Sequence, residues 1–103
     1  MTFEPKDFWV YIMASGPRCV LYTSMTSDLV GRATQHRERQ IEGFTRRSWV
    51  SRLVWFESHD DAAAADQRER AIKRWRRDWK IALVEKDNPT WRDLFPDIMP
   101  AED

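Results

Sequence analysis

The stretch FWVYIMASGPRCVLYTSMT, residues 8–26, decides the fold. Its first part, residues 8–14, is an apolar run rich in aromatic and β-branched types, which favours a β-strand. The Ser-Gly-Pro-Arg sequence at residues 15–18 is typical of a turn, and residues 19–26 form a second strand candidate. A short loop centred on the Gly-Pro pair would join the two strands into a β-hairpin.

The hairpin predicts a specific pairing of two tyrosines. If the turn is symmetric about the Gly-Pro pair, Tyr11 lies directly opposite Tyr22. Both side chains would then point to the same face of the sheet, about 5 Å apart at Cβ. A one-residue bulge in either strand would remove this pairing.

Two helices and a third strand are expected after the hairpin. Residues 28–39 should form a helix, since residues 26–28 offer N-cap side chains. Residues 52–57 alternate as a strand, and residues 62–74 or beyond, which begin with four alanines, favour a longer helix. The Asn-Pro pair at residues 88–89 should end the helical stretch. This order predicts a small α+β fold with helices packed on a short sheet and a helical C-terminal end.

The longer helix carries an apolar stripe at spacings of three and four residues, which is expected to face the core. Its members are Ile72, Trp75, Trp79 and Leu83. A break near Arg77 would leave no trace in this periodicity. A second apolar set is expected to pack the C-terminal segment back on the domain: Trp91, Leu94, Phe95 and Ile98.

Length and composition limit the class of protein. The 103 residues allow one domain over residues 1–103, and one cysteine, Cys19, excludes an internal disulfide framework. No apolar run approaches the roughly 20 residues of a membrane helix. The first residues contain no apolar signal-peptide segment. We therefore expect a soluble, cytoplasmic, single-domain protein.

Basic and acidic residues balance over the whole chain, 17 of each, but they are separated along it. Residues 68–80 hold seven basic residues against two acidic ones, and residues 32–52 hold six against two. Residues 93–103 hold four acidic residues and no basic one. Such separation can give one face a positive potential that suits a polyanion such as nucleic acid. Solvated helix faces would explain the same pattern.

Three sets of residues could carry chemistry. Glu69 lies three residues before Ile72, near an apolar helix face, where a carboxylate needs a cation. That cation is either a nearby arginine or Mg²⁺, which a single carboxylate can hold together with substrate phosphate and water. Arg32 and His36 share one helix face and could hold a phosphate and move a proton, or simply be solvated. The two tyrosines serve either sheet packing or catalysis.

These features together resemble the GIY-YIG nuclease family. Residues 9–11 (Trp-Val-Tyr) and 22–24 (Tyr-Thr-Ser) match its two signature tripeptides with both tyrosines kept, and residues 26–36 resemble its helix with an arginine and, four positions on, a histidine. Residues 68–77 resemble its helix with the metal-binding glutamate. Further likeness is found at residues 43–47, 53–57, 80–85 and 88–94. The chain resembles the small stand-alone bacterial members, related to the N-terminal nuclease domain of excision-repair proteins, over a core of about residues 8–95.

The resemblance implies a three-stranded antiparallel sheet flanked by helices. It also implies hydrolysis of phosphodiester bonds by a Mg²⁺- or Mn²⁺-dependent endonuclease, in DNA or another structured nucleic acid, with DNA repair as a setting. It brings five residues to one catalytic site: Tyr11, Tyr22, Arg32, His36 and Glu69.

The expected roles follow the chemistry of these groups. Glu69 would hold the metal, and Arg32 would neutralise charge on the phosphate. Tyr11 is the favoured general base, with the second tyrosine and His36 as alternatives. Ser24 stands where the motif has glycine, and its added Cβ and hydroxyl could crowd a phosphate or hydrogen-bond to it.

The nucleic-acid-binding surface is expected to use five basic residues: Arg46, Arg47, Lys73, Arg76 and Arg77. Two other classes of function remain open. One is a nucleic-acid-binding module that has lost turnover through Ser24, and the other is a protein-interaction domain whose basic helix meets an acidic partner. A homodimer or another partner could supply target selection.

Overall fold

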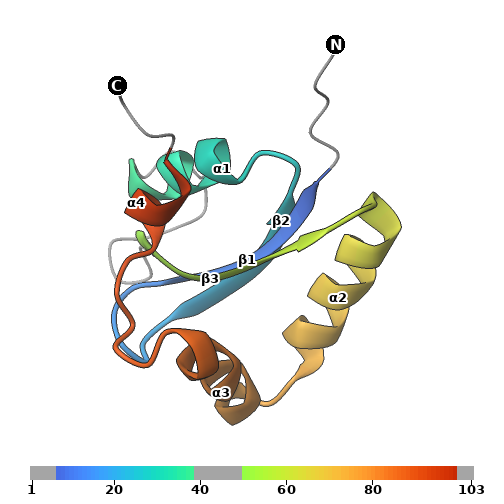
Figure 1. Cartoon of the computed structure of the whole chain (residues 1–103). Helices are drawn as coiled ribbons and strands as arrows, with labels where there is room; N and C mark the ends of the chain where they lie inside the picture. Colours follow the sequence, from blue (N-terminus) through green and yellow to red (C-terminus); the bar gives the residue numbers. More distant parts are fainter. Residues whose placement is uncertain (1–6, 39–49, 100–103) are drawn as a thin grey trace.

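The computed structural model describes residues 7–38 and 50–99, and their fold is α+β, as the sequence predicts (Figure 1). A three-stranded antiparallel sheet has the order β2-β1-β3. The central strand is β1 (Phe8–Ala14), and its neighbours are β2 (Leu21–Thr26) and β3 (Arg52–His59). The most apolar run of the chain therefore lies in the middle of the sheet, where both faces are covered.

Four helices of the described residues flank the sheet. The helices α1 (Leu29–Arg37) and α4 (Phe95–Ile98) contact each other on one side, and α2 (Ala62–Arg74) and α3 (Arg77–Asp87) lie on the other (Figure 1). Of these, α2 packs across all three strands. The sheet thus separates an α1 side from an α2 side.

Two aspartates begin α1 and α2, and the first of them lies within the N-cap candidates expected at residues 26–28. The Asp28 carboxylate accepts a hydrogen bond from the Gly31 backbone N–H at 3.0 Å, and that of Asp61 accepts one from Ala64 at 2.7 Å. Each satisfies a backbone donor that the first helical turn leaves without a partner. At position 31 a Cβ would lie 2.1 Å from an Asp28 carboxylate oxygen, so any other residue there would displace the capping side chain.

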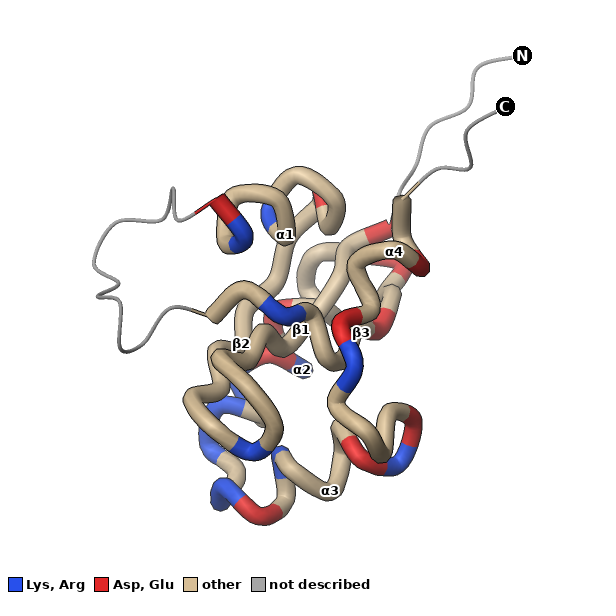
Figure 2. Tube along the Cα trace, turned by 90° about the vertical axis from the view of Figure 1, so that its left-hand side faces the viewer, with Lys and Arg blue, Asp and Glu red and all other residues tan. Residues whose placement is uncertain are grey.

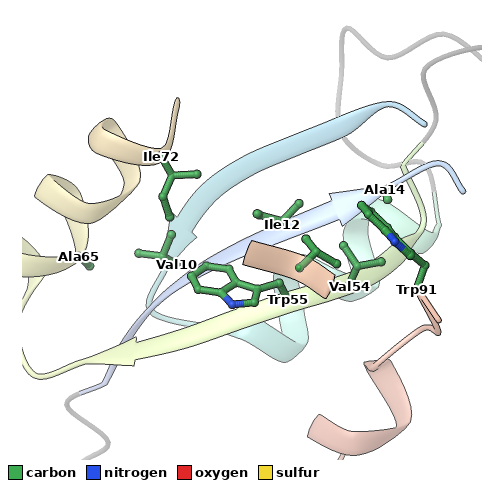
Figure 3. Packing of buried hydrophobic residues seen from close by; sticks show 9 residues of the cluster. Val10, Ile12, Ala14, Val54, Trp55, Ala65, Ile72 and Trp91 are labelled. Carbon is green, nitrogen blue, oxygen red and sulfur yellow. The ribbon is translucent and has the colours of Figure 1, made fainter. Parts of the chain in front are cut away.

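The core consists of two clusters, one on each face of the sheet. Val10, Ile12 and Val54 point to the α2 side, where they meet Ala65 and Ile72 (Figure 3). The alternate residues of β1 point to the α1 side, in a cluster of Tyr11, Met13, Leu29, Val50 and Leu53. This is the alternation expected of a strand buried on both faces. The C-terminal segment packs back as predicted, since Trp91 joins the first cluster and Leu94 and Ile98 cover the second.

The register of the hairpin differs from the prediction by two residues. Tyr11 pairs with Ser24, and Tyr22 pairs with Met13. The turn is centred one position later than expected: the Cys19 N–H donates to the Gly16 carbonyl at 3.3 Å, and Arg18 has a φ of 53°. Proline favours the second position of such a turn, which explains the shift. Because the shift is even, both tyrosines still point to the same face.

The predicted apolar stripe is wrong at one position. The backbone is extended at Trp75 and Arg76, with ψ values of 152° and 153°, so the helical stretch breaks there. Trp79 consequently turns outward and is 52% exposed. The Arg77 guanidinium donates to the backbone carbonyls of Arg18 and Cys19, which anchors the start of α3 to the hairpin turn.

Within the described ranges no helix is long and apolar enough to cross a membrane. Arg46 and Arg47, two of the residues expected to bind nucleic acid, fall within residues 39–49, outside the described residues.

Candidate active site

The rings of Tyr11, Tyr22 and His36, from three different elements, form a cluster on the α1 side of the sheet, which we call the tyrosine cluster. The Tyr22 and His36 ring centroids are 4.9 Å apart, and the Tyr11 ring lies 5.9 Å from His36 and 6.5 Å from Tyr22. The Tyr11 hydroxyl is 3.3 Å from Nε2 of His36, a hydrogen-bonding distance. The tyrosines meet because positions 11 and 22 point to one face of the hairpin, and α1 then lays His36 against them.

A cation lies beside this cluster. Arg32 precedes His36 by about one helical turn, so both project from the same side of α1. Its guanidinium donates a hydrogen bond to the Gln35 side chain at 3.3 Å. Among the described residues no carboxylate forms an ion pair with Arg32. A half-buried guanidinium of this kind has capacity left for an anion.

Burial and charge act in opposite directions on Tyr11. Burial raises the pKa of its hydroxyl above the usual value of 10, since the anion would lose its hydration. Hydrogen bonding from the Arg32 and Ser24 side chains to the Tyr11 oxygen, together with the positive charge of Arg32, lowers the pKa and partly offsets the shift. The phenol therefore stays protonated at neutral pH.

His36 is neutral at physiological pH for related reasons. Burial, and to a smaller extent the neighbouring Arg32 charge, together lower its pKa from 6.5 to about 4. A neutral imidazole has one ring nitrogen that accepts a proton. Nε2 of His36 can therefore accept the hydrogen bond that the Tyr11 hydroxyl donates.

The members of the cluster differ in their access to solvent. Tyr11 is fully buried and His36 is 2% exposed, whereas Tyr22, Ser24 and Arg32 are half-buried. A ligand arriving from solvent would therefore first meet the last three. The buried pair lies behind them, and the charge of Arg32 lowers the pKa of both its members.

Ser24 is the residue of this site that the sequence indicated least clearly. It lies directly opposite Tyr11, and hydrogen bonding from its side chain lowers the pKa of the Tyr11 hydroxyl. The sequence predicts only that its added Cβ and hydroxyl could crowd a phosphate or hydrogen-bond to it, and no contact with Tyr11. Residues 22 and 24 are two apart in one strand, so their side chains point to the same face of the sheet. This spacing is the signal that would have placed Ser24 on the face that carries the tyrosines.

Glu69 does not lie in the tyrosine cluster. It belongs to α2, on the opposite side of the sheet, and its side chain is 13% exposed. Its carboxylate forms an ion pair with Lys73 at 3.0 Å, one turn further along the helix. In the described part of the chain it makes no hydrogen bond or ion pair with the tyrosine cluster. The alternative of a structural ion pair is thus present, with a lysine in place of the expected arginine.

The donor set on the α2 side limits how a metal could be held. No group of three or more His, Cys, Asp or Glu side chains within residues 7–38 and 50–99 could hold a metal ion. Glu69 offers one carboxylate, and the Thr23 hydroxyl on β2 faces the same side, buried and without a hydrogen-bond partner among described residues. These are hard oxygen donors that fit Mg²⁺ held by one carboxylate plus substrate phosphate and water.

The predicted nucleic-acid-binding residues have different surroundings. Several basic positions gather at the end of the molecule where α2 passes into α3 (Figure 2). Lys73 pairs with Glu69, Arg76 pairs with Asp78 at 3.2 Å, and Arg77 binds the hairpin carbonyls. The first two are exposed and could contact phosphates, whereas Arg77 has a structural role.

A groove of about 440 Å³ opens on the α1 side, close to the start of α1. Its walls are mostly apolar, with Trp9, Leu29 and Phe56 among them, and Asp28 and Asp97 also line it. Two carboxylates disfavour a phosphate there. Phosphate is therefore better accommodated at Arg32.

Comparisons with protein families and with known proteins point to one family. Residues 7–82 match the model of the GIY-YIG catalytic domain. A UPF0213 protein from Haloquadratum walsbyi is 35% identical over 78 residues, which cover 76% of this chain and 86% of that protein. No solved structure matches the chain significantly. The match spans the strands of the tyrosine cluster, α1 with Arg32 and His36, and α2 with Glu69, and the chain belongs to the GIY-YIG family.

Proposed function

We propose that this protein is a divalent-metal-dependent endonuclease that hydrolyses phosphodiester bonds in DNA or another structured nucleic acid. The observation that carries the proposal is Arg32, a half-buried guanidinium without a carboxylate partner among the described residues, set against two tyrosines and a neutral histidine. Such a cation is suited to the oxygens of a phosphodiester. Family membership supplies the reaction class.

The half-buried groups would make the first contacts with substrate. Arg32 neutralises the charge that develops on the non-bridging phosphate oxygens. The hydroxyl of Tyr22, a half-buried residue, orients the attacking water. Tyr11 accepts the proton of that water while its own hydroxyl proton passes to Nε2 of His36, so that no isolated phenolate forms.

Glu69 would bind Mg²⁺ or Mn²⁺ through its carboxylate. The metal would stabilise charge on the scissile phosphate and the leaving oxygen. Since α2 packs over the edge strand β2, a shared site would extend around that edge from Glu69 to Tyr22 and Arg32. Lys73 would exchange its ion pair with Glu69 for contacts with the phosphate.

A second candidate function is nucleic-acid binding without turnover. Two observations favour it: Ser24 occupies the site next to Tyr11, and Glu69 is already paired with Lys73. In this case Arg32 would hold phosphate, but no cleavage would follow.

The relation to excision-repair nucleases rests on the sequence motifs.

The two functions are separated by incubating labelled branched or nicked DNA with the protein in Mg²⁺, in Mn²⁺ and in EDTA. An endonuclease cleaves with either metal and not in EDTA, and Tyr11→Phe, which removes the proposed general base, lowers the rate by roughly 100-fold or more. Binding without cleavage in all three buffers would support the second function. Absence of both binding and cleavage would contradict both.

A further inference from the structure

The break between α2 and α3 creates an aromatic surface that is not part of the tyrosine cluster. Trp75 and Trp79 meet edge to face, with ring centroids 6.0 Å apart. With Ala82, Leu83 and Lys86 they line an open hollow of about 320 Å³. We call this surface the tryptophan platform. Trp79 is 52% exposed, an unusual position for the largest apolar side chain.

Cations surround the tryptophan platform. The Arg76 guanidinium lies over the Trp79 ring, 5.4 Å from its centroid, and Lys86 lines the hollow. Lys86 forms no ion pair with any described residue, and residues 68–80 beside it are strongly basic. Flat aromatic rings beside positive charges are complementary to a base attached to a phosphate backbone.

The platform is also separate from the tyrosine cluster. It belongs to α3 and the end of α2, on the side of the sheet away from Tyr11 and α1 (Figure 1). A nucleotide held there cannot be the one whose phosphate meets Arg32. It must be another nucleotide of the same substrate.

We propose that the tryptophan platform binds unpaired bases of a single-stranded segment that flanks the cleaved bond. This inference rests on the proposed function, since it assumes a nucleic-acid substrate. In a duplex the faces of the bases are stacked on their neighbours, so a tryptophan can reach them only where the strands separate. The preferred substrate is therefore nucleic acid with a single-stranded part, such as a branch, a flap or a nick with a frayed end.

The test measures the affinity of the full chain for three labelled ligands in EDTA, where metal-dependent cleavage does not occur. The ligands are a single-stranded oligonucleotide, the duplex of the same sequence, and the same single strand with abasic sites. Trp79→Ala should weaken binding of the single strand by about 5- to 100-fold, the range for loss of one stacked base. The variant should bind the duplex and the abasic strand as the wild type does, because the phosphate contacts remain.

Two control variants belong to the experiment. Trp79→Phe keeps a flat ring and should recover much of the single-strand affinity. Met99→Ala removes a comparably exposed apolar side chain, 44% exposed, from the end of α4, and should change none of the three affinities. A thermal melt of each variant excludes unfolding as the cause.

The possible failures are distinguishable. If the wild type binds and cleaves nucleic acid but Trp79→Ala binds the single strand as tightly as the wild type, the platform does not bind unpaired bases. The proposed function would then still stand. Equal weakening for all three ligands would mean that stacking is not involved and would overturn the platform. Weakened binding of a labelled polyglutamate peptide, with the single strand unaffected, would assign the surface to an acidic protein. A wild type that binds none of the nucleic acids would overturn both proposals.

Discussion

At the scale of single residues, His36 links the site to pH. Its pKa in the folded protein is about 4, below the ordinary value of 6.5, so the unfolded chain takes up a proton that the folded chain does not. Stability should therefore fall as pH decreases from about 6.5 to about 4, by up to about 3 kcal/mol, and then level off. His36→Phe keeps a ring against Tyr22 and should remove this part of the pH dependence.

The measurement is urea unfolding of both proteins between pH 3.5 and 7.5. The wild type should lose stability relative to His36→Phe across the stated window. Parallel curves for the two proteins would show that His36 is not held neutral by the fold.

Arg32 should affect both the rate and the charge state of its neighbour. Replacing it by Met removes a positive charge that lowers the pKa of His36, so that pKa should rise above about 4 while burial keeps it below 6.5. Cleavage should decrease by roughly 100- to 1,000-fold, as for loss of one charge-stabilising donor. An NMR titration of the His36 ring checks the first effect and single-turnover cleavage the second.

Arg37→Met is the matched control for Arg32. Arg37 lies on the same helix but is exposed, pairs with Asp93 and lies over the Phe95 ring. Its loss should leave both the pKa of His36 and the cleavage rate unchanged. If Arg32→Met behaved like this control, Arg32 would not be the phosphate-binding cation.

At the scale of elements, α2 depends on its N-cap, since the Asp61 carboxylate satisfies the Ala64 N–H. Asp61→Ala should lower the free energy of unfolding by about 1 kcal/mol. Asp60→Ala changes an equally exposed neighbour without a capping bond, and should stay within about 0.5 kcal/mol of the wild type. Chemical denaturation of the three proteins compares them, and equal losses in both variants would argue against the cap.

The elements also show which features a sequence can reveal. The strands and main helices were predictable because their signals are local: an apolar run for β1, and capping aspartates for α1 and α2. The parity of Tyr11 and Tyr22 was predictable because side chains alternate along strands. The exact register was not, since the position that Pro17 takes in the turn moved it by two residues.

The α2–α3 break lay beyond prediction. Trp75 and Arg76, where it occurs, are neither glycine nor proline, and the anchor comes from Arg77 bonding to a turn almost sixty residues away. Such a tertiary contact leaves no periodic signal. The exposure of Trp79, and with it the tryptophan platform, follows from this break.

At the scale of the whole molecule, the sheet divides the proposed machinery. The tyrosines, His36 and Arg32 lie on the α1 side, and Glu69 lies on the α2 side. The sequence placed these five residues in one site through family resemblance, and the geometry of the described residues brings four of them together. The part of Glu69 in catalysis therefore stays a prediction, and it decides whether this chain is an enzyme or a binding module.

The most direct test of the account is single-turnover cleavage of labelled branched DNA in Mg²⁺ by the wild type, Glu69→Gln and Asp66→Asn, with DNA affinity measured in parallel in EDTA. Asp66 is the matched control, since it lies on the same helix and forms a comparable ion pair with Arg70 at 3.0 Å. We predict that Glu69→Gln cleaves roughly 100-fold more slowly or worse, as loss of a metal ligand implies, with affinity unchanged. Asp66→Asn should cleave as the wild type does. Wild-type cleavage by Glu69→Gln, or equal losses in the two variants, would contradict the account.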